Sequence, residues 1–69
     1  MKALLITHCS DSHMWYADHL GKIVPLINTY ADEYLSREPA GYTNIVRKQD
    51  ATIVDVSQEL ILYLPEYLR

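Results

Sequence analysis

The fold predicted for this chain rests on the stretch Tyr34-Leu35-Ser36-Arg37-Glu38-Pro39-Ala40-Gly41-Tyr42-Thr43-Asn44-Ile45-Val46-Arg47. The stretch predicts a β-hairpin, because Pro39 presets φ for the first turn position and Gly41 can adopt a positive φ. A three-residue loop that combines a type I turn with a left-handed glycine is a common way to close a hairpin.

This loop also predicts the register of the two strands. The expected cross-strand pairs are Glu38 with Tyr42, Arg37 with Thr43, Ser36 with Asn44, and Leu35 with Ile45. Leu35 and Ile45 then share one face of the hairpin, whereas Tyr34 and Val46 share the other. We expect the Leu35–Ile45 pair to be buried.

Length and composition limit the chain to one small domain. It has 69 residues, a hydrophobic share of 49% and a net charge of −3, which fits a globular protein and excludes a disordered one. The only cysteine, Cys9, cannot form an intramolecular disulfide. The six basic residues are scattered, unlike the basic stripe of a nucleic-acid-binding protein.

The beginning of the chain predicts a strand rather than a signal peptide. Its apolar run, residues 3–6, is interrupted by the polar residues Thr7, His8 and Ser10. No apolar run in the sequence approaches the length of a transmembrane helix. We therefore expect a cytoplasmic protein.

Three further strands are expected, over residues 3–9, 22–28 and 51–56. Pro25 cannot donate a ladder hydrogen bond, so the second of these is an edge strand or carries a bulge. Residues 29–33 read as a polar connection, and residues 48–50 as one turn of 3₁₀ helix. Residues 10–21 form a long loop in which Trp15 plugs one end of the barrel; a short helix over residues 13–20, ended by Gly21, is the alternative.

The C-terminal segment, residues 57–69, predicts a short helix. Leu60, Leu64 and Leu68 recur at helical spacing, and Pro65 kinks or ends the helix. This apolar stripe either covers the open end of the barrel or forms the contact of a homodimer. The expected domain is thus residues 1–69, with a barrel over 1–56 and the helical segment over 57–69.

The order of elements resembles that of small SH3-like barrel proteins found in phages and mobile elements. The resemblance is carried by Trp15, Gly21-Lys22-Ile23-Val24, Tyr34-Leu35, Glu38, Gly41-Tyr42, Ile45-Val46, Asp50-Ala51 and Ile53-Val54. It implies a mostly β fold, a five-stranded SH3-like barrel, and a binding role without catalytic residues. The C-terminal helix departs from that pattern.

The histidines and the cysteine concentrate in one segment, which raises the question of a metal site. His8, Cys9, His13 and His19 lie within twelve positions, and such residues are the usual zinc ligands. His8 and Cys9 are adjacent, however, and adjacent residues of a strand point to opposite faces, so both cannot bind one ion without a bulge. The spacing also matches no zinc signature. We expect no metal and no cofactor, and because so small a barrel offers little pocket for a substrate, no enzyme.

The six tyrosines and one tryptophan suggest a protein-binding module, such as an accessory protein of a phage or mobile element that acts on a host protein. The candidate binding residues are Trp15, Tyr16, Tyr34, Tyr42, Leu64 and Tyr67. Half-buried strand tyrosines are the alternative explanation. Two rival functions remain: a nucleic-acid-associated barrel using Lys22, Arg37, Arg47 and Lys48, and a small-ligand or metal-binding module using the His8–His19 loop.

Overall fold

The structure is a computed structural model that describes residues 1–56. Its elements, in chain order, are β1 (Lys2–Ile6), the 3₁₀ turn η1 (Ala17–His19), β2 (Ile23–Pro25), β3 (Asn28–Thr29), β4 (Glu33–Arg37), β5 (Thr43–Arg47), the 3₁₀ turn η2 (Lys48–Asp50) and β6 (Ala51–Asp55). The predicted C-terminal helix, with Leu64 and Tyr67, lies outside the described residues. None of the helical elements in residues 1–56 is long and apolar enough to cross a membrane.

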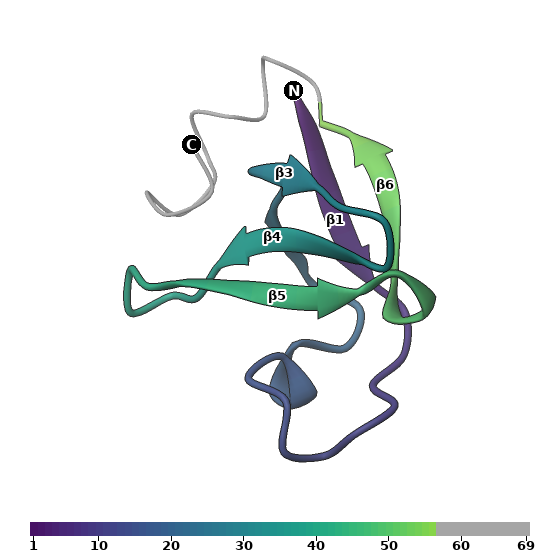
Figure 1. Ribbon diagram of the computed structural model, residues 1–69, viewed down its shortest axis with the longest axis vertical. Coiled ribbons are helices and arrows are strands. Elements are labelled where there is room, and N and C mark those ends of the chain that lie inside the picture. Colours follow the sequence, from purple (N-terminus) through teal and green to yellow (C-terminus); the bar gives the residue numbers. More distant parts are fainter. Residues whose placement is uncertain (57–69) are drawn as a thin grey trace.

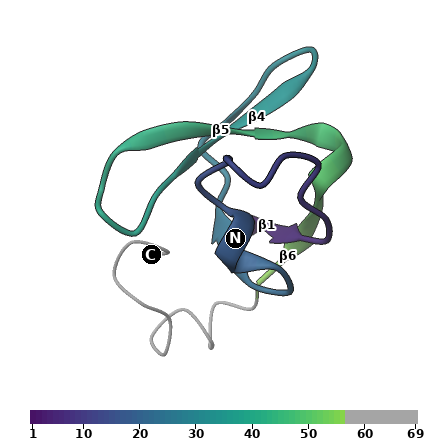
Figure 2. The same ribbon diagram turned by 90° about the horizontal axis from the view of Figure 1, so that it is seen from below.

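The strands form two small antiparallel sheets, in the orders β2-β1-β6 and β3-β4-β5. In Figure 1 the β4 and β5 strands lie in front of β1, and Figure 2 shows the same two layers from below. The prediction of a mostly β fold is confirmed. The predicted five-stranded SH3-like barrel is not closed within residues 1–56, because the strands described there pair as two separate sheets.

The separation of the sheets lies between β2 and β3, where the sequence predicted one continuous strand. Among the described strands, β2 pairs only with β1, and β3 pairs only with β4. Pro25 ends β2, and because proline has no backbone N–H it cannot extend a hydrogen-bonded ladder. Leu26 and Ile27 then carry the chain from one sheet to the other.

The β4–β5 hairpin has the predicted register. Tyr34 pairs with Val46, Leu35 with Ile45, Ser36 with Asn44 and Arg37 with Thr43. The Glu38 N–H donates to the Tyr42 carbonyl at 2.7 Å, and Gly41 has φ of +103°. The turn chemistry of Pro39 and Gly41 therefore determines the pairing locally.

The burial of the hairpin differs from the prediction. Ser36 and Val46 are fully buried, whereas Leu35 and Ile45 are only half-buried. The reason is that the sheet containing β1 packs on the face of the hairpin that carries Val46. The Leu35–Ile45 pair lies on the opposite, outward face.

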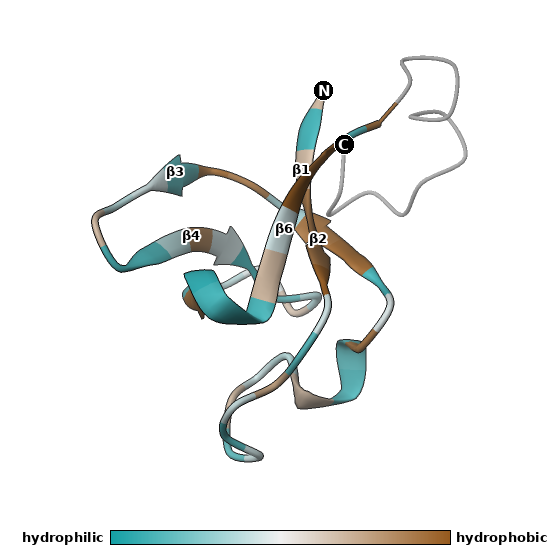
Figure 3. Cartoon of the chain, turned by 90° about the vertical axis from the view of Figure 1, so that its right-hand side faces the viewer, coloured by the Kyte–Doolittle hydropathy of each residue, from teal (hydrophilic) through white to brown (hydrophobic). Residues whose placement is uncertain are grey.

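The core lies between the two sheets. It consists of Leu4 and Ile6 of β1, Val24, Val46, Ala51 and, from the long loop, Tyr16. Figure 3 shows the hydrophobic character of β1, β2 and β6.

The segment after β1 is the predicted long loop, with one 3₁₀ turn (Ala17–His19) instead of a helix over 13–20. Trp15 was expected to plug one end of the barrel, but it is only partly buried against the core, whereas its neighbour Tyr16 is fully buried.

β1 is shorter than predicted, ending at Ile6 rather than residue 9. The backbone N–H groups of Thr7 and His8 both donate to the Asp50 carbonyl, at 2.9 and 3.2 Å. Two successive N–H groups cannot bond one carbonyl in a regular ladder, so the chain turns away from the sheet here. Asp50 ends the predicted 3₁₀ turn, which is confirmed.

Candidate functional site

The buried carboxylate of Asp50 is the centre of the described polar network. Asp50 has no exposed surface. Its Oδ2 atom accepts hydrogen bonds from the Tyr16 hydroxyl at 2.5 Å, the Ser10 hydroxyl at 2.9 Å and the Ser10 N–H at 3.3 Å. The three donors converge on Oδ2, which helps to keep the buried carboxylate ionised, whereas Oδ1 is buried without a hydrogen-bond partner among the described residues.

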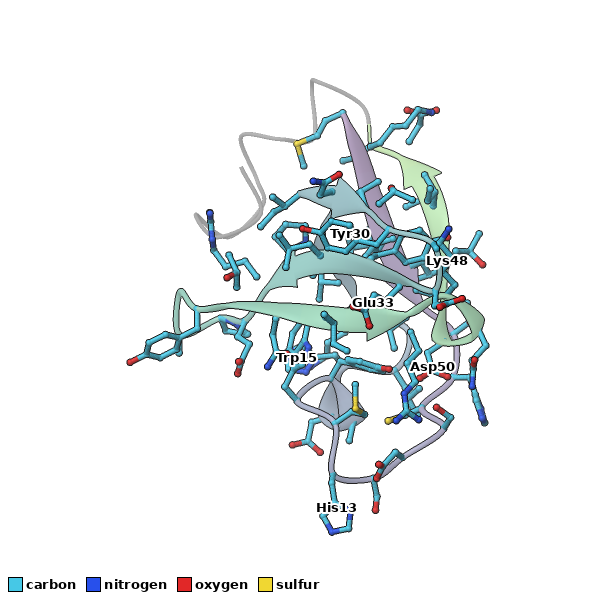
Figure 4. The ribbon with its side chains drawn as sticks, in the orientation of Figure 1. His13, Trp15, Tyr30, Glu33, Lys48 and Asp50 are labelled. Carbon is cyan, nitrogen blue, oxygen red and sulfur yellow. The ribbon has the colours of Figure 1, made fainter. Side chains whose placement is uncertain are left out.

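The network joins three parts of the chain. The Tyr16 hydroxyl accepts the Arg47 N–H at 3.3 Å, and Arg47 Nη1 donates to Ser10 Oγ at 3.1 Å. Loop 7–22, the end of β5 and η2 are thus held together around Asp50, which is labelled in Figure 4. We call Ser10, Tyr16, Arg47 and Asp50 the Asp50 cluster.

Two ionisable groups in this cluster have shifted pKa values. Burial acts to raise the pKa of Asp50, but the hydrogen bonds from Tyr16 and Ser10 outweigh it and leave the pKa below its usual value. Burial, together with the hydrogen bond to Asp50, raises the pKa of Tyr16. The charge therefore stays on the carboxylate and the proton on the phenol. The hydrogen bonds of the cluster hold the loop in place, and Tyr16 is buried where a substrate cannot reach it.

Trp15 and Tyr16 also occupy the outer edge of β5. The Trp15 Nε1–H donates to the Ile45 carbonyl at 2.7 Å, next to the Tyr16–Arg47 bond. The two rings meet edge to face, with centroids 5.5 Å apart. Polar groups of the hairpin that would otherwise be open to another strand are therefore bonded to side chains of the loop.

The predicted aromatic binding residues occupy different environments. Tyr16 is a core residue, and Trp15 is half-buried with its indole N–H bonded internally. Tyr34 is half-buried, with Lys48 Nζ 5.5 Å from the centre of its ring. Tyr42 stands at the hairpin tip with 72% of its surface exposed. These four residues do not form one recognition surface, and Leu64 and Tyr67 lie outside the described residues.

The histidine-rich loop has its own local contacts. Cys9 Sγ donates to the Asp11 carbonyl at 3.0 Å, and Asp11 Oδ1 binds the His13 N–H at 2.9 Å and His13 Nδ1 at 3.1 Å. These bonds from His13 lower the pKa of Asp11. Within residues 1–56, no three His, Cys, Asp or Glu side chains are placed to hold one metal ion.

A more open surface is the outward face of the β3-β4-β5 sheet, which we call the hairpin face. By register, it carries Asn28, Tyr30, Glu33, Leu35, Arg37, Thr43, Ile45 and Arg47. Leu35 and Ile45 form its centre, and charged residues lie around them. Tyr30 is 44% exposed, and Figure 4 labels it between β3 and β4, with Glu33 labelled lower, over β5.

Sequence reasoning missed Tyr30 because it fell in a supposed polar connection. The Tyr30 N–H donates to the Glu33 carbonyl at 2.8 Å, so Ala31 and Asp32 form a two-residue turn. The signal was present in the sequence: an aspartate in a short connection before a β-rich run is typical of a tight turn. Once that turn is recognised, Tyr30 lies opposite Glu33 and on the same face.

The basic residues of the nucleic-acid alternative are dispersed. Arg37 and Arg47 share the hairpin face, but they lie at its two ends with Leu35 and Ile45 between them. They are ten positions apart in the sequence. Along β5, Arg47 lies four positions, about 13 Å, from Thr43, the residue opposite Arg37. Lys48 lies over Tyr34.

Two features thus stand out in the described residues: the Asp50 cluster, which anchors the loop, and the hairpin face, which is partly exposed. Comparisons of the chain with protein families, curated proteins and solved structures found no match. The assignment of a function therefore rests on the residues themselves.

Proposed function

We propose that this chain is a non-enzymatic protein-binding module with an SH3-like barrel, serving as an accessory protein of a phage or mobile element that acts on a host protein. The element order supports the fold. If β2 and β3 are counted as halves of one bent strand, five strands remain, with a long early loop, a short hairpin and a 3₁₀ turn before the last strand. This is the order in which the sequence resembles SH3-like proteins.

The hairpin face carries the proposal. Its centre is the apolar Leu35–Ile45 pair, and its periphery holds Tyr30 and the charged residues Glu33 and Arg37. An apolar centre with a polar rim, and an exposed tyrosine at its border, is the usual anatomy of a protein–protein interface. The opposite face of the same sheet packs on the core and is not free.

The geometry favours an extended peptide segment as the partner. The apolar part of the face is narrow, one side chain from each of two strands, so it suits a few apolar side chains better than a large flat surface. Charges of both signs at the rim would orient such a segment, because a basic partner residue fits Glu33 and an acidic one fits Arg37. Binding then depends on Tyr30 more than on the tyrosine at the hairpin tip.

Two matched tyrosine variants test this proposal. The full chain, its Tyr30→Ala variant and its Tyr42→Ala variant are immobilised, and proteins retained from a lysate of the source organism are identified and quantified. Both substitutions remove an exposed tyrosine, but Tyr30 lies on the hairpin face and Tyr42 on the other side at the tip. A protein bound by the wild type and by Tyr42→Ala, and lost with Tyr30→Ala, is the expected result.

Other outcomes count against the proposal. A partner lost equally from both variants, or from neither, would place its contact elsewhere. Recovery of nucleic acid whose binding weakens steeply with added salt would favour the nucleic-acid alternative, because phosphate contacts are salt-dependent.

A further inference from the structure

The outer edge of β6 differs from the other sheet edges of the described chain. β2 ends in Pro25, β3 has two residues, and the β5 edge is bonded to Trp15 and Tyr16. β6, in contrast, has five residues, and within residues 1–56 it pairs only with β1. Short edges, prolines and covering side chains are the ways proteins protect sheet edges.

The register identifies which groups of β6 point outward. Met1 and Val56 exchange two backbone hydrogen bonds. Because bonded positions recur at every second residue of an antiparallel strand, Val54 and Thr52 also direct their backbone polar groups toward β1. The intervening residues direct their backbone polar groups away from β1. The outer edge therefore presents the Ile53 N–H and carbonyl, the Asp55 N–H and the Ala51 carbonyl.

The side chains of β6 do not oppose strand addition at its centre. Thr52, Ile53 and Val54 are all β-branched residues, which favour strands, and Ile53 is 39% exposed. The one charged residue, Asp55, stands at the end of the strand and has its own counterion, Lys2, at 3.2 Å. Protective lysines, prolines or inward charges are missing from residues 51–54.

We infer that β6 binds β6 of a second copy of this chain, antiparallel and with Ile53 at the two-fold axis. The strand is self-complementary in this register. Ile53 lies opposite the partner's Ile53, Thr52 lies opposite Val54, and Ala51 lies opposite Asp55. No two like charges are then directly opposed, and each outward Ile53 N–H gains an acceptor.

The dimer joins the two β2-β1-β6 sheets into one continuous sheet. It does not involve β3, β4 or β5, so the hairpin face stays free in both copies. This inference is therefore independent of the proposed binding function, and either can fail without the other. It also differs from a dimer through the C-terminal stripe, because its contacts come from residues 51–55 alone.

Paired charge variants test the inference on the full chain. Sedimentation equilibrium over a concentration series should give a dimer for the wild type and a monomer for Ile53→Lys, in which two lysines would be directly opposed. Thr52→Lys is the matched control: its side chain faces Val54 rather than itself, so dimerisation should persist. A mixture of Ile53→Lys and Ile53→Glu should recover the dimer, because the opposed charges then attract.

Amide hydrogen exchange of the wild type gives a second readout that needs no substitution. The Ile53 N–H should become more protected as the protein concentration rises, whereas the Val54 N–H, bonded to β1, should be protected throughout. A chain that stays monomeric, a charge mixture that does not associate, or an Ile53 N–H protected equally at all concentrations would each overturn the inference. The last result would mean that another segment of the same chain occupies the edge.

Discussion

The Tyr16 hydroxyl donates to the Asp50 carboxylate at 2.5 Å across 34 positions of sequence, and neither residue has exposed surface. This contact ties the middle of loop 7–22 to the turn that begins the last strand. Because Tyr16 also accepts the Arg47 N–H, it links the loop to β5 as well as to η2. Stability and loop geometry are therefore coupled at one buried pair.

Removal of the Tyr16 hydroxyl should destabilise the protein. Tyr16→Phe keeps the ring in the core but deprives the buried carboxylate and the Arg47 N–H of a partner, which costs about 1–3 kcal/mol of the free energy of unfolding. Urea unfolding followed by the fluorescence of Trp15 measures the change. Tyr30→Phe, on the surface, is the control and should unfold like the wild type. Equal unfolding of both variants would show that the Tyr16–Asp50 bond adds no net stability.

Acid should weaken the fold through Asp50. Its pKa in the folded protein lies below the 3.8 of a free aspartate, so folding favours the ionised form. The resulting stabilisation is complete above the unfolded pKa and is lost as the pH falls through the folded pKa. The free energy of unfolding should therefore decrease from about pH 5 downward.

The Asp50→Asn variant isolates this effect. It should be less stable than the wild type at neutral pH, because an amide accepts the three bonds less well, and its stability should depend less on acid. Asp11→Asn serves as the control. The pKa of the Asp11 carboxyl is also lowered, but this carboxyl bonds only His13, which is exposed. If the free energy of unfolding of Asp50→Asn fell in acid as steeply as that of the wild type, Asp50 would not be the group that causes the loss of stability.

Ser36→Ala should leave stability unchanged or raise it. Ser36 is fully buried in β4, and its Oγ has no hydrogen-bond partner among the described residues. Burying a hydroxyl without a hydrogen-bond partner costs free energy, and Ser36→Ala removes that desolvation cost. The cavity left by one missing oxygen atom costs no more than this. Thermal unfolding by circular dichroism is sufficient as a measurement. A marked loss of stability would reveal a partner for this hydroxyl.

Gly41→Ala should destabilise the hairpin by about 1 kcal/mol. Gly41 has φ of +103°, and a Cβ built there meets no atom within 4 Å. The cost is thus backbone strain alone, without a steric clash. Ala40→Ser, an exposed neighbour in the same turn, is the control. Equal melting temperatures of the two variants would argue against a required positive φ at this position.

Prediction from the sequence succeeded where the controlling chemistry is local. The hairpin register follows from Pro39 and Gly41, which act within the turn that they form. The 3₁₀ turn at Lys48–Asp50 was likewise predicted and found. Prediction failed at Leu35 and Ile45, because alternation shows which residues share a face but not which face meets the other sheet.

The candidate site shows the same limit. Tyr42 and Tyr16 were both candidate binding residues, but the structure leaves Tyr42 exposed and buries Tyr16. Nothing in the loop sequence His13-Met14-Trp15-Tyr16-Ala17-Asp18 shows which of the two adjacent aromatic residues, Trp15 or Tyr16, is buried. Tyr30 could have been found, had the two-residue turn after it been recognised.

The sequence by itself determined the register of the β4–β5 hairpin, the 3₁₀ turn at Lys48–Asp50 and the alternation of side chains along each strand, because these depend on neighbours in the chain. Only the tertiary structure decided that Asp50 is buried, that Tyr16 bonds it and that β2 and β3 belong to different sheets. Those features arise from contacts between distant segments, such as Ser10 and Asp50, which are 40 positions apart. The physical reason is that burying a charge is favourable only when its donors converge in space, and convergence is a property of the folded chain.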